Sequence, residues 1–139
     1  MRLFLDTSAF VKRYVDEPGS DRVLELTAAA DELGLSVIVV PESISTLTRL
    51  LREQRLSRAD YDALKMAILT DMDGVDLCDM TPSRVKNSIT CLEHSPLRAL
   101  DAIHLGSALA YRPDLFVTAD RRQLIAAEKQ GLHVEDVGS

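Results

Sequence analysis

The chain begins with a short apolar run that ends in a carboxylate and two hydroxyls. Leu3 to Leu5 are followed directly by Asp6, Thr7 and Ser8. An apolar run without polar alternation is typical of a strand buried on both faces, as strands of parallel sheets are. Ligands of open α/β sheets bind at the carboxyl ends of the strands, so Asp6 is a candidate site residue. The alternative is that Asp6 only starts a helix and stabilises its N-terminus.

The rest of the chain alternates apolar runs with segments of helical periodicity. Strands are predicted at 3–5, 35–40, 75–80, 115–118 and 132–137, and helices at 8–15, 21–33, 43–54, 58–73, 82–94, 97–111 and 123–129. In the helix at 82–94 we expect Val85, Ile89 and Leu92 to face the core. This order predicts a three-layer α/β/α sandwich around a mainly parallel central sheet. A length of 139 residues fits one domain spanning 1–139.

Composition narrows the classes of protein. The net charge of -6 argues against a protein held on nucleic acid by bulk positive charge, although an acidic metal site would account for part of the excess. Cys78 and Cys91 have no metal-ligand spacing and are interpreted as two buried thiols in a reducing cytoplasm. We find no signal peptide and no apolar run near the roughly 20 residues of a spanning helix. A cytoplasmic protein without membrane contact is expected.

Carboxylates recur at similar positions along the chain. Asp6, Glu42 and Asp120 each follow an apolar run predicted to be a strand, and parallel strands would bring all three to one edge of the sheet. Asp101 is a lone acid in the apolar segment 97–105, where it either starts a helix or lines a cleft.

Four carboxylates in one small cleft would repel each other unless a cation lay between them. Carboxylate ligands suit Mg²⁺ or Mn²⁺ better than zinc. The chemistry that such a site predicts is metal-assisted hydrolysis of phosphodiesters.

In this order of motifs the chain resembles the PIN-domain family, with the nearest likeness to the VapC-like toxins of type II (VapBC) toxin–antitoxin pairs. The motifs that carry the resemblance are Leu5 to Ser8, Glu42 to Arg49, Leu100 to Leu105 and Val117 to Asp120. The segment around Asp101 is the most specific match, and Pro41 before Glu42 departs from the family pattern. The likeness extends from Arg2 to about Asp136.

The resemblance implies a PIN-like fold, Mg²⁺-dependent cleavage of RNA with Mn²⁺ as a substitute, a homodimer, and a cognate antitoxin protein as partner. It makes Asp6 and Asp101 the main metal ligands, whereas Glu42 and Asp120 complete the catalytic pocket, in part through water molecules of the ion. Hydroxyls beside these acids would orient carboxylates or waters. They belong to Thr7, Ser8 and Thr118.

Several assignments keep an alternative. Arg49, Arg98 and Arg121 are candidate RNA contacts, but each fits a solvated surface equally well. His104, one turn after Asp101, is either a general base or a hydrogen-bonded core histidine, and the second interpretation is favoured. Apolar stripes in the helices at 43–73 fit a dimer interface, a groove for an antitoxin helix or ordinary core.

Three rival functions remain. The first is a non-catalytic PIN-like interaction module, and the second is another metal-dependent phosphohydrolase. The third, a phosphohydrolase with Asp6 as an aspartyl nucleophile, is disfavoured, because haloacid-dehalogenase-like enzymes need a second Asp where this chain has Ser8.

Overall fold

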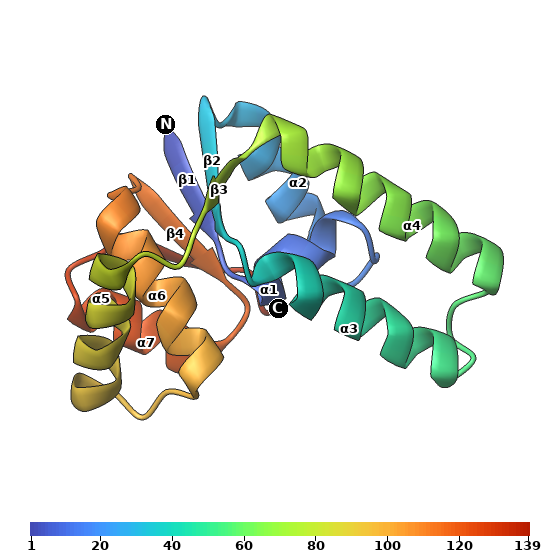
Figure 1. Cartoon of the computed structure of the whole chain (residues 1–139). Helices are drawn as coiled ribbons and strands as arrows, with labels where there is room; N and C mark the ends of the chain where they lie inside the picture. Colours follow the sequence, from blue (N-terminus) through green and yellow to red (C-terminus); the bar gives the residue numbers. More distant parts are fainter.

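A five-stranded, all-parallel sheet forms the centre of the molecule in the computed structural model, which describes residues 1–139 (Figure 1). The strand order is β3-β2-β1-β4-β5, so the first strand of the chain is the middle of the sheet. The strands are β1 (Arg2–Leu5), β2 (Glu32–Ser36), β3 (Asp76–Cys78), β4 (Leu115–Thr118) and β5 (Val134–Asp136). The strand predicted at 75–80 is observed as the shorter β3, which lies at one edge of the sheet.

Helices cover both faces of the sheet. They are α1 (Thr7–Phe10), α2 (Ser20–Ala29), α3 (Val39–Arg52), α4 (Arg58–Asp71), α5 (Pro82–His94), α6 (Ala99–Tyr111) and α7 (Arg121–Lys129). Short 3₁₀ helices, η1 (Val11–Arg13) and η2 (Met72–Gly74), follow α1 and α4. None of the helices combines the length and the apolar character that crossing a membrane would take.

Central strand β1 supplies side chains to two separate cores. Leu3 and Leu5 pack with residues of α1 to α4, whereas Phe4 lies on the other face with residues of α5, α6 and α7. None of the three is exposed to solvent. Alternate side chains of a strand point to opposite faces, so the unbroken apolar run is what a strand between two helical layers requires. The three-layer sandwich predicted from the sequence is therefore confirmed (Figure 1).

The boundary between β2 and α3 differs from the prediction. The predicted strand 35–40 is wrong in its second half, because β2 ends at Ser36 and α3 already begins at Val39. Pro41 falls in the first turn of α3, where the missing amide hydrogen costs nothing. Glu42 therefore lies in the first turn of a helix and not at the end of a strand.

Gly34 lies within β2, although its sequence position suggested the end of the preceding helix. That helix, α2, stops at Ala29. A Cβ atom at Gly34 would come within 2.7 Å of the Tyr111 ring, so the close approach of α6 to the sheet requires a glycine here.

Helix α5 packs by its small residues, which corrects a second prediction. Val85, Ile89 and Leu92 were expected in the core but are 40%, 52% and 41% exposed. The buried positions of α5 are Ser88 and Cys91. This face lies so close to Gly106 of α6 that a Cβ there would stand 2.7 Å from the Ser88 amide nitrogen. Close helix packing thus leaves an apolar stripe of α5 on the surface.

Candidate active site

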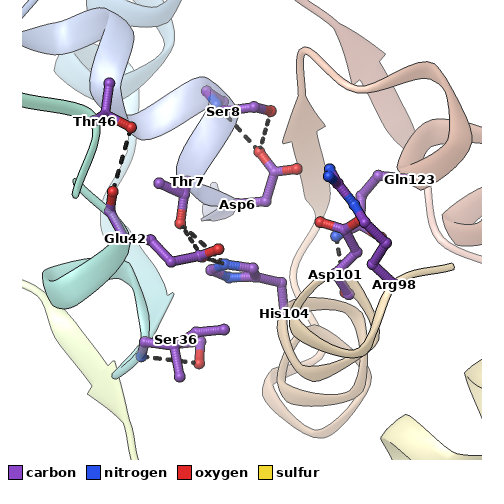
Figure 2. A network of polar contacts seen from close by, with 12 residues as sticks. Asp6, Thr7, Ser8, Ser36, Glu42, Thr46, Arg98, Asp101, His104 and Gln123 are labelled. Atoms are coloured by element: carbon purple, nitrogen blue, oxygen red, sulfur yellow. Dashed lines mark hydrogen bonds and ion pairs between the residues drawn. The ribbon is translucent and has the colours of Figure 1, made fainter. Parts of the chain in front are cut away.

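Asp6 lies at the carboxyl end of β1 and is only 3% exposed. It also caps α1, because its Oδ1 accepts the Ala9 amide at 3.1 Å. The Ser8 hydroxyl donates to the same oxygen at 2.7 Å (Figure 2). The Thr118 hydroxyl donates to Oδ2 at 2.5 Å. Burial raises the pKa of Asp6, against the lowering effects of nearby His104 and of these hydrogen bonds. The helix-start alternative for Asp6 is therefore confirmed, and its role as a site residue stays a prediction.

Thr118 and Ser8 join the ends of the two central strands. The Thr118 hydroxyl, fully buried at the end of β4, also accepts the Asp120 amide at 3.0 Å. The Ser8 hydroxyl accepts the Ala119 amide at 2.9 Å. These contacts fix Asp6 relative to the segment that carries Asp120.

Glu42 reaches the same region from α3 through two polar partners. Its Oε1 accepts the Thr7 hydroxyl at 2.6 Å and lies 2.6 Å from Nε2 of His104 (Figure 2). Burial by itself raises the pKa of Glu42, but the hydrogen bonds from His104 and Thr7 outweigh it and hold the pKa below its ordinary value.

His104 is the hydrogen-bonded, buried histidine that the sequence favoured. It is 1% exposed, and because Glu42 accepts at Nε2, that nitrogen carries a proton. The other ring nitrogen, Nδ1, is buried without a hydrogen-bond partner.

Asp101 lies in the first turn of α6, beside an arginine. Arg98 Nε donates to its Oδ2 at 3.3 Å, and the Arg98 side chain remains 79% exposed. The side-chain amide of Gln123 donates to the Asp101 carbonyl oxygen at 2.9 Å, which connects α7 to α6. Asp120 caps α7 through hydrogen bonds from the amides of Arg122 and Gln123, so its helix-start role is also real.

One cavity of about 210 Å³, the acidic cavity, brings the four predicted acids together. Its walls are formed by Asp6, Thr7, Ser8, Val11, Glu42, Thr46, Arg98, Asp101, His104 and Asp120. Side chains from β1, α1, α3, α6 and the end of β4 thus meet at the carboxyl edge of the sheet, where ligands of parallel α/β folds bind.

The donor set suits a hard divalent cation, because its members are carboxylate oxygens and no thiolate is present. Asp6 accepts three hydrogen bonds, so about one of its four lone-pair positions is free for a further partner. In this arrangement no three acidic, histidine or cysteine side chains are gathered closely enough to hold an ion. Protein partners engage each of the four acids instead: hydroxyls for Asp6, His104 for Glu42, Arg98 for Asp101, and backbone amides of α7 for Asp120.

The candidate RNA contacts separate into two groups. Arg98 lines the acidic cavity, whereas Arg49 and Arg121 do not. Arg49 is exposed on α3 and lies 3.8 Å from Glu53, and Arg121 is the exposed first residue of α7.

Two contributors to the site were missed by sequence reasoning. Thr46 lines the cavity one turn after Glu42 and donates to its carbonyl oxygen at 3.3 Å, and helical spacing was the available signal. Gln123 is fully buried behind Asp101, with Oε1 unpartnered, and its sequence context carries no such signal.

The fold and the acidic cavity define an α/β protein with a carboxylate-rich site at the edge of a parallel sheet. The model of the PIN domain matches residues 3–129, and the chain therefore belongs to the PIN-domain family. Comparison with curated proteins finds no significant match.

Solved structures with the same fold include three toxins or toxin complexes. VapBC-1 from nontypeable Haemophilus influenzae is 16% identical, with a TM-score of 0.71 and 100% of both chains covered. VapC20 from Mycobacterium tuberculosis, described as a sarcin-ricin-loop-cleaving toxin, is 16% identical, with a TM-score of 0.66 and coverage of 94% and 95%. A toxin–antitoxin complex from Klebsiella pneumoniae is 14% identical, with a TM-score of 0.67 and coverage of 88% and 89%. The likeness to these structures is one of fold.

Proposed function

We propose that residues 1–139 form a single PIN-like domain that acts as a Mg²⁺-dependent endoribonuclease, with Mn²⁺ as a substitute ion. The observation that carries this proposal is that Asp6, Glu42, Asp101 and Asp120, which come from four different segments, line one cavity. Carboxylate oxygens that line one cavity are the kind of donor that a hard divalent cation prefers.

The ion would activate water for attack on a phosphodiester and offset the negative charge that develops at the phosphorus. Asp6 is the fixed ligand in the proposal, because three hydrogen bonds hold it in place. Asp101 is the second main ligand, and Arg98 beside it is free to turn toward a phosphate. Glu42 is oriented by Thr7 and His104, and its lowered pKa keeps it ionised at neutral pH.

Toxin activity is the second part of the proposal. The structural neighbours include toxin–antitoxin complexes, and one is described as a toxin that cleaves the sarcin-ricin loop. We propose an RNA substrate in the cytoplasm and a cognate antitoxin protein that inhibits the chain.

A homodimer is proposed as the oligomeric state. The apolar stripe of α5, formed by Val85, Ile89 and Leu92, is unpartnered in the single chain. Exposed apolar stripes of this kind mark interaction surfaces, and a second copy packing its own stripe against the first would bury both.

A non-catalytic PIN-like module is the second candidate. It is favoured by the internal pairing of the acids, since Glu42 is bound to His104 and Asp101 to Arg98 without three acids close together.

Incubation of the purified chain with total bacterial RNA separates the two functions. A nuclease cleaves in Mg²⁺ or Mn²⁺, stops with EDTA, and loses activity at least a hundredfold in Asp101→Asn. A non-catalytic module leaves the RNA intact under all conditions. Growth arrest on expression that is abolished by Asp6→Ala would support the toxin role, and arrest by Asp6→Ala itself would refute the nuclease mechanism.

A further inference from the structure

A second cavity lies directly beside the acidic cavity and is larger, about 450 Å³. The two cavities share Thr7, Glu42 and Thr46 as a common wall. These residues lie together on one side of the site, opposite Arg98 and Asp101 (Figure 2). A ligand that fills the second cavity is therefore adjacent to whatever occupies the first.

The lining of the second cavity differs from that of the acidic cavity. Ile38 and Leu100 supply apolar surface, and Leu100 is 47% exposed although it belongs to this wall. Ser45 adds a hydroxyl to those of Thr7 and Thr46. Glu42 is the only charged residue of the lining, and no lysine or arginine is present.

This chemistry excludes a phosphate as the occupant. An anion next to Glu42 would be repelled, and this lining has no basic side chain to offset the repulsion, whereas the acidic cavity has Arg98 and, in the proposed function, a divalent cation. Apolar walls combined with hydroxyl groups instead suit an uncharged ring that has polar atoms along its edge. The volume is within the range of small-molecule sites and is sufficient for a nucleobase with part of its sugar.

We propose that the second cavity is a base pocket, which binds the nucleobase of a nucleotide next to the phosphate in the acidic cavity. The inference rests on the proposed function, because it takes the acidic cavity as the place of the cleaved phosphate. A base lies within one nucleotide of its phosphate, and the shared wall of Thr7, Glu42 and Thr46 imposes the same adjacency on the two cavities.

The pocket holds the base without an aromatic platform. No phenylalanine or tyrosine lines it, so the base would pack against Ile38 and Leu100 and its edge would be read by hydroxyls. The pocket would thereby make cleavage depend on the base at one position.

Ser45→Phe tests the pocket, because it places a ring in the cavity from an exposed position of α3. The Ser45 side chain makes no hydrogen bond, and only its carbonyl oxygen accepts one, from Thr48, so the fold does not depend on it. Thr48→Phe is the matched control, since it places the same ring on α3 at a position that does not line the cavity.

The probes are the uncharged nucleosides adenosine and uridine, titrated into the metal-free chain and followed by the methyl resonances of Ile38 and Leu100. The proposal predicts saturable shifts at these methyls, a dissociation constant raised at least tenfold in Ser45→Phe, and a change of less than threefold in Thr48→Phe. No saturable shift, or equal shifts in Ser45→Phe, would overturn it. A shift of the same methyl resonances on addition of a protein partner, with no shift on addition of either nucleoside, would also overturn the proposal.

A second measurement separates this inference from the proposed function. In RNA cleavage, Ser45→Phe is expected to lose base preference at one position beside the cut while the requirement for Mg²⁺ remains. Unchanged base preference in Ser45→Phe refutes the base pocket alone. Absence of cleavage by the unmodified chain refutes the proposed nuclease, whereas the nucleoside titration still decides the pocket.

Discussion

Removal of the Thr118 hydroxyl tests how the protein holds its most deeply buried acid. In Thr118→Val the side chain keeps its shape but Asp6 loses the donor to Oδ2, and the Asp120 amide loses its acceptor. Hydrogen bonds to charged groups contribute about 1.5–3 kcal/mol, and a buried group left unpaired adds to the cost. We therefore expect the free energy of unfolding at pH 7 to fall by about 2–3 kcal/mol.

The expected thermal shift follows from the size of the chain. An unfolding entropy of about 2.1 cal/mol/K per residue over 139 residues is about 0.3 kcal/mol/K, so the loss corresponds to a Tm lower by about 7–10 °C. Thr118→Ser is the matched control, because it keeps the hydroxyl and removes one methyl group, at about 1 kcal/mol. Urea denaturation at pH 7 with both variants measures the difference directly.

The effect should depend on pH in a defined direction. Burial raises the folded-state pKa of Asp6 above its unfolded value, so Asp6 binds more protons in the folded state and opposes stability as the pH rises through this window. The Thr118 hydrogen bond stabilises the ionised form of Asp6 and works against that loss. The difference in free energy of unfolding between Thr118→Val and the parent should therefore be largest above the folded-state pKa of Asp6. It should become smaller as the pH falls through that pKa. A Thr118→Val protein within about 0.5 kcal/mol of Thr118→Ser at pH 7 would refute the reasoning.

Three further predictions concern other parts of the molecule. Gly106→Ala should lower the free energy of unfolding by about 1–2 kcal/mol, because its Cβ would stand 2.7 Å from the α5 backbone. Gly74→Ala should leave the free energy of unfolding unchanged, because the space around Gly74 is open. Urea denaturation of both variants makes the comparison. Burial raises the pKa of Cys91 to about 11, and Cys78 is also buried. A disulfide reagent at pH 8 should therefore modify both thiols within minutes in the unfolded chain but not in the folded chain. Fast reaction of the folded chain would contradict the burial of these thiols. Ile89→Glu should convert the proposed homodimer to a monomer in light scattering while the Tm changes little, and a persistent dimer places the interface elsewhere.

The central strands could be predicted from sequence because their burial on two faces leaves a local signature. Leu3 to Leu5 and Leu115 to Val117 are apolar without interruption, and both runs belong to strands. The run from Val37 to Val40 has the same composition, but its residues turn and enter α3, since packing against the core overrides local β propensity. Asp6 and Asp120 were therefore placed correctly after strand ends, whereas Glu42, predicted to follow a strand directly, lies in the first turn of α3.

The site could be predicted in outline but not in its pairings. Four acids were expected in one cleft from strand ends and motif likeness, and all four line the acidic cavity. The hydrogen bond between His104 and Glu42 joins residues 62 positions apart, and nothing local in the sequence indicates it. The exposed stripe of α5 was missed for a similar reason. The apolar periodicity of α5 carries no information about Gly106 of α6, and it is the close approach at Gly106 that makes the small residues of α5 the packed face.

Calorimetric titration with Mn²⁺ tests most directly whether the four acids act together around a cation. The account predicts saturable binding to the unmodified chain and a dissociation constant at least tenfold higher in the double variant Asp6→Asn, Asp101→Asn. The titrations of the unmodified chain and of the double variant are run at the same pH and ionic strength, because surface carboxylates also bind cations weakly. Equal affinity in the two proteins would contradict the shared metal site and with it the proposed nuclease.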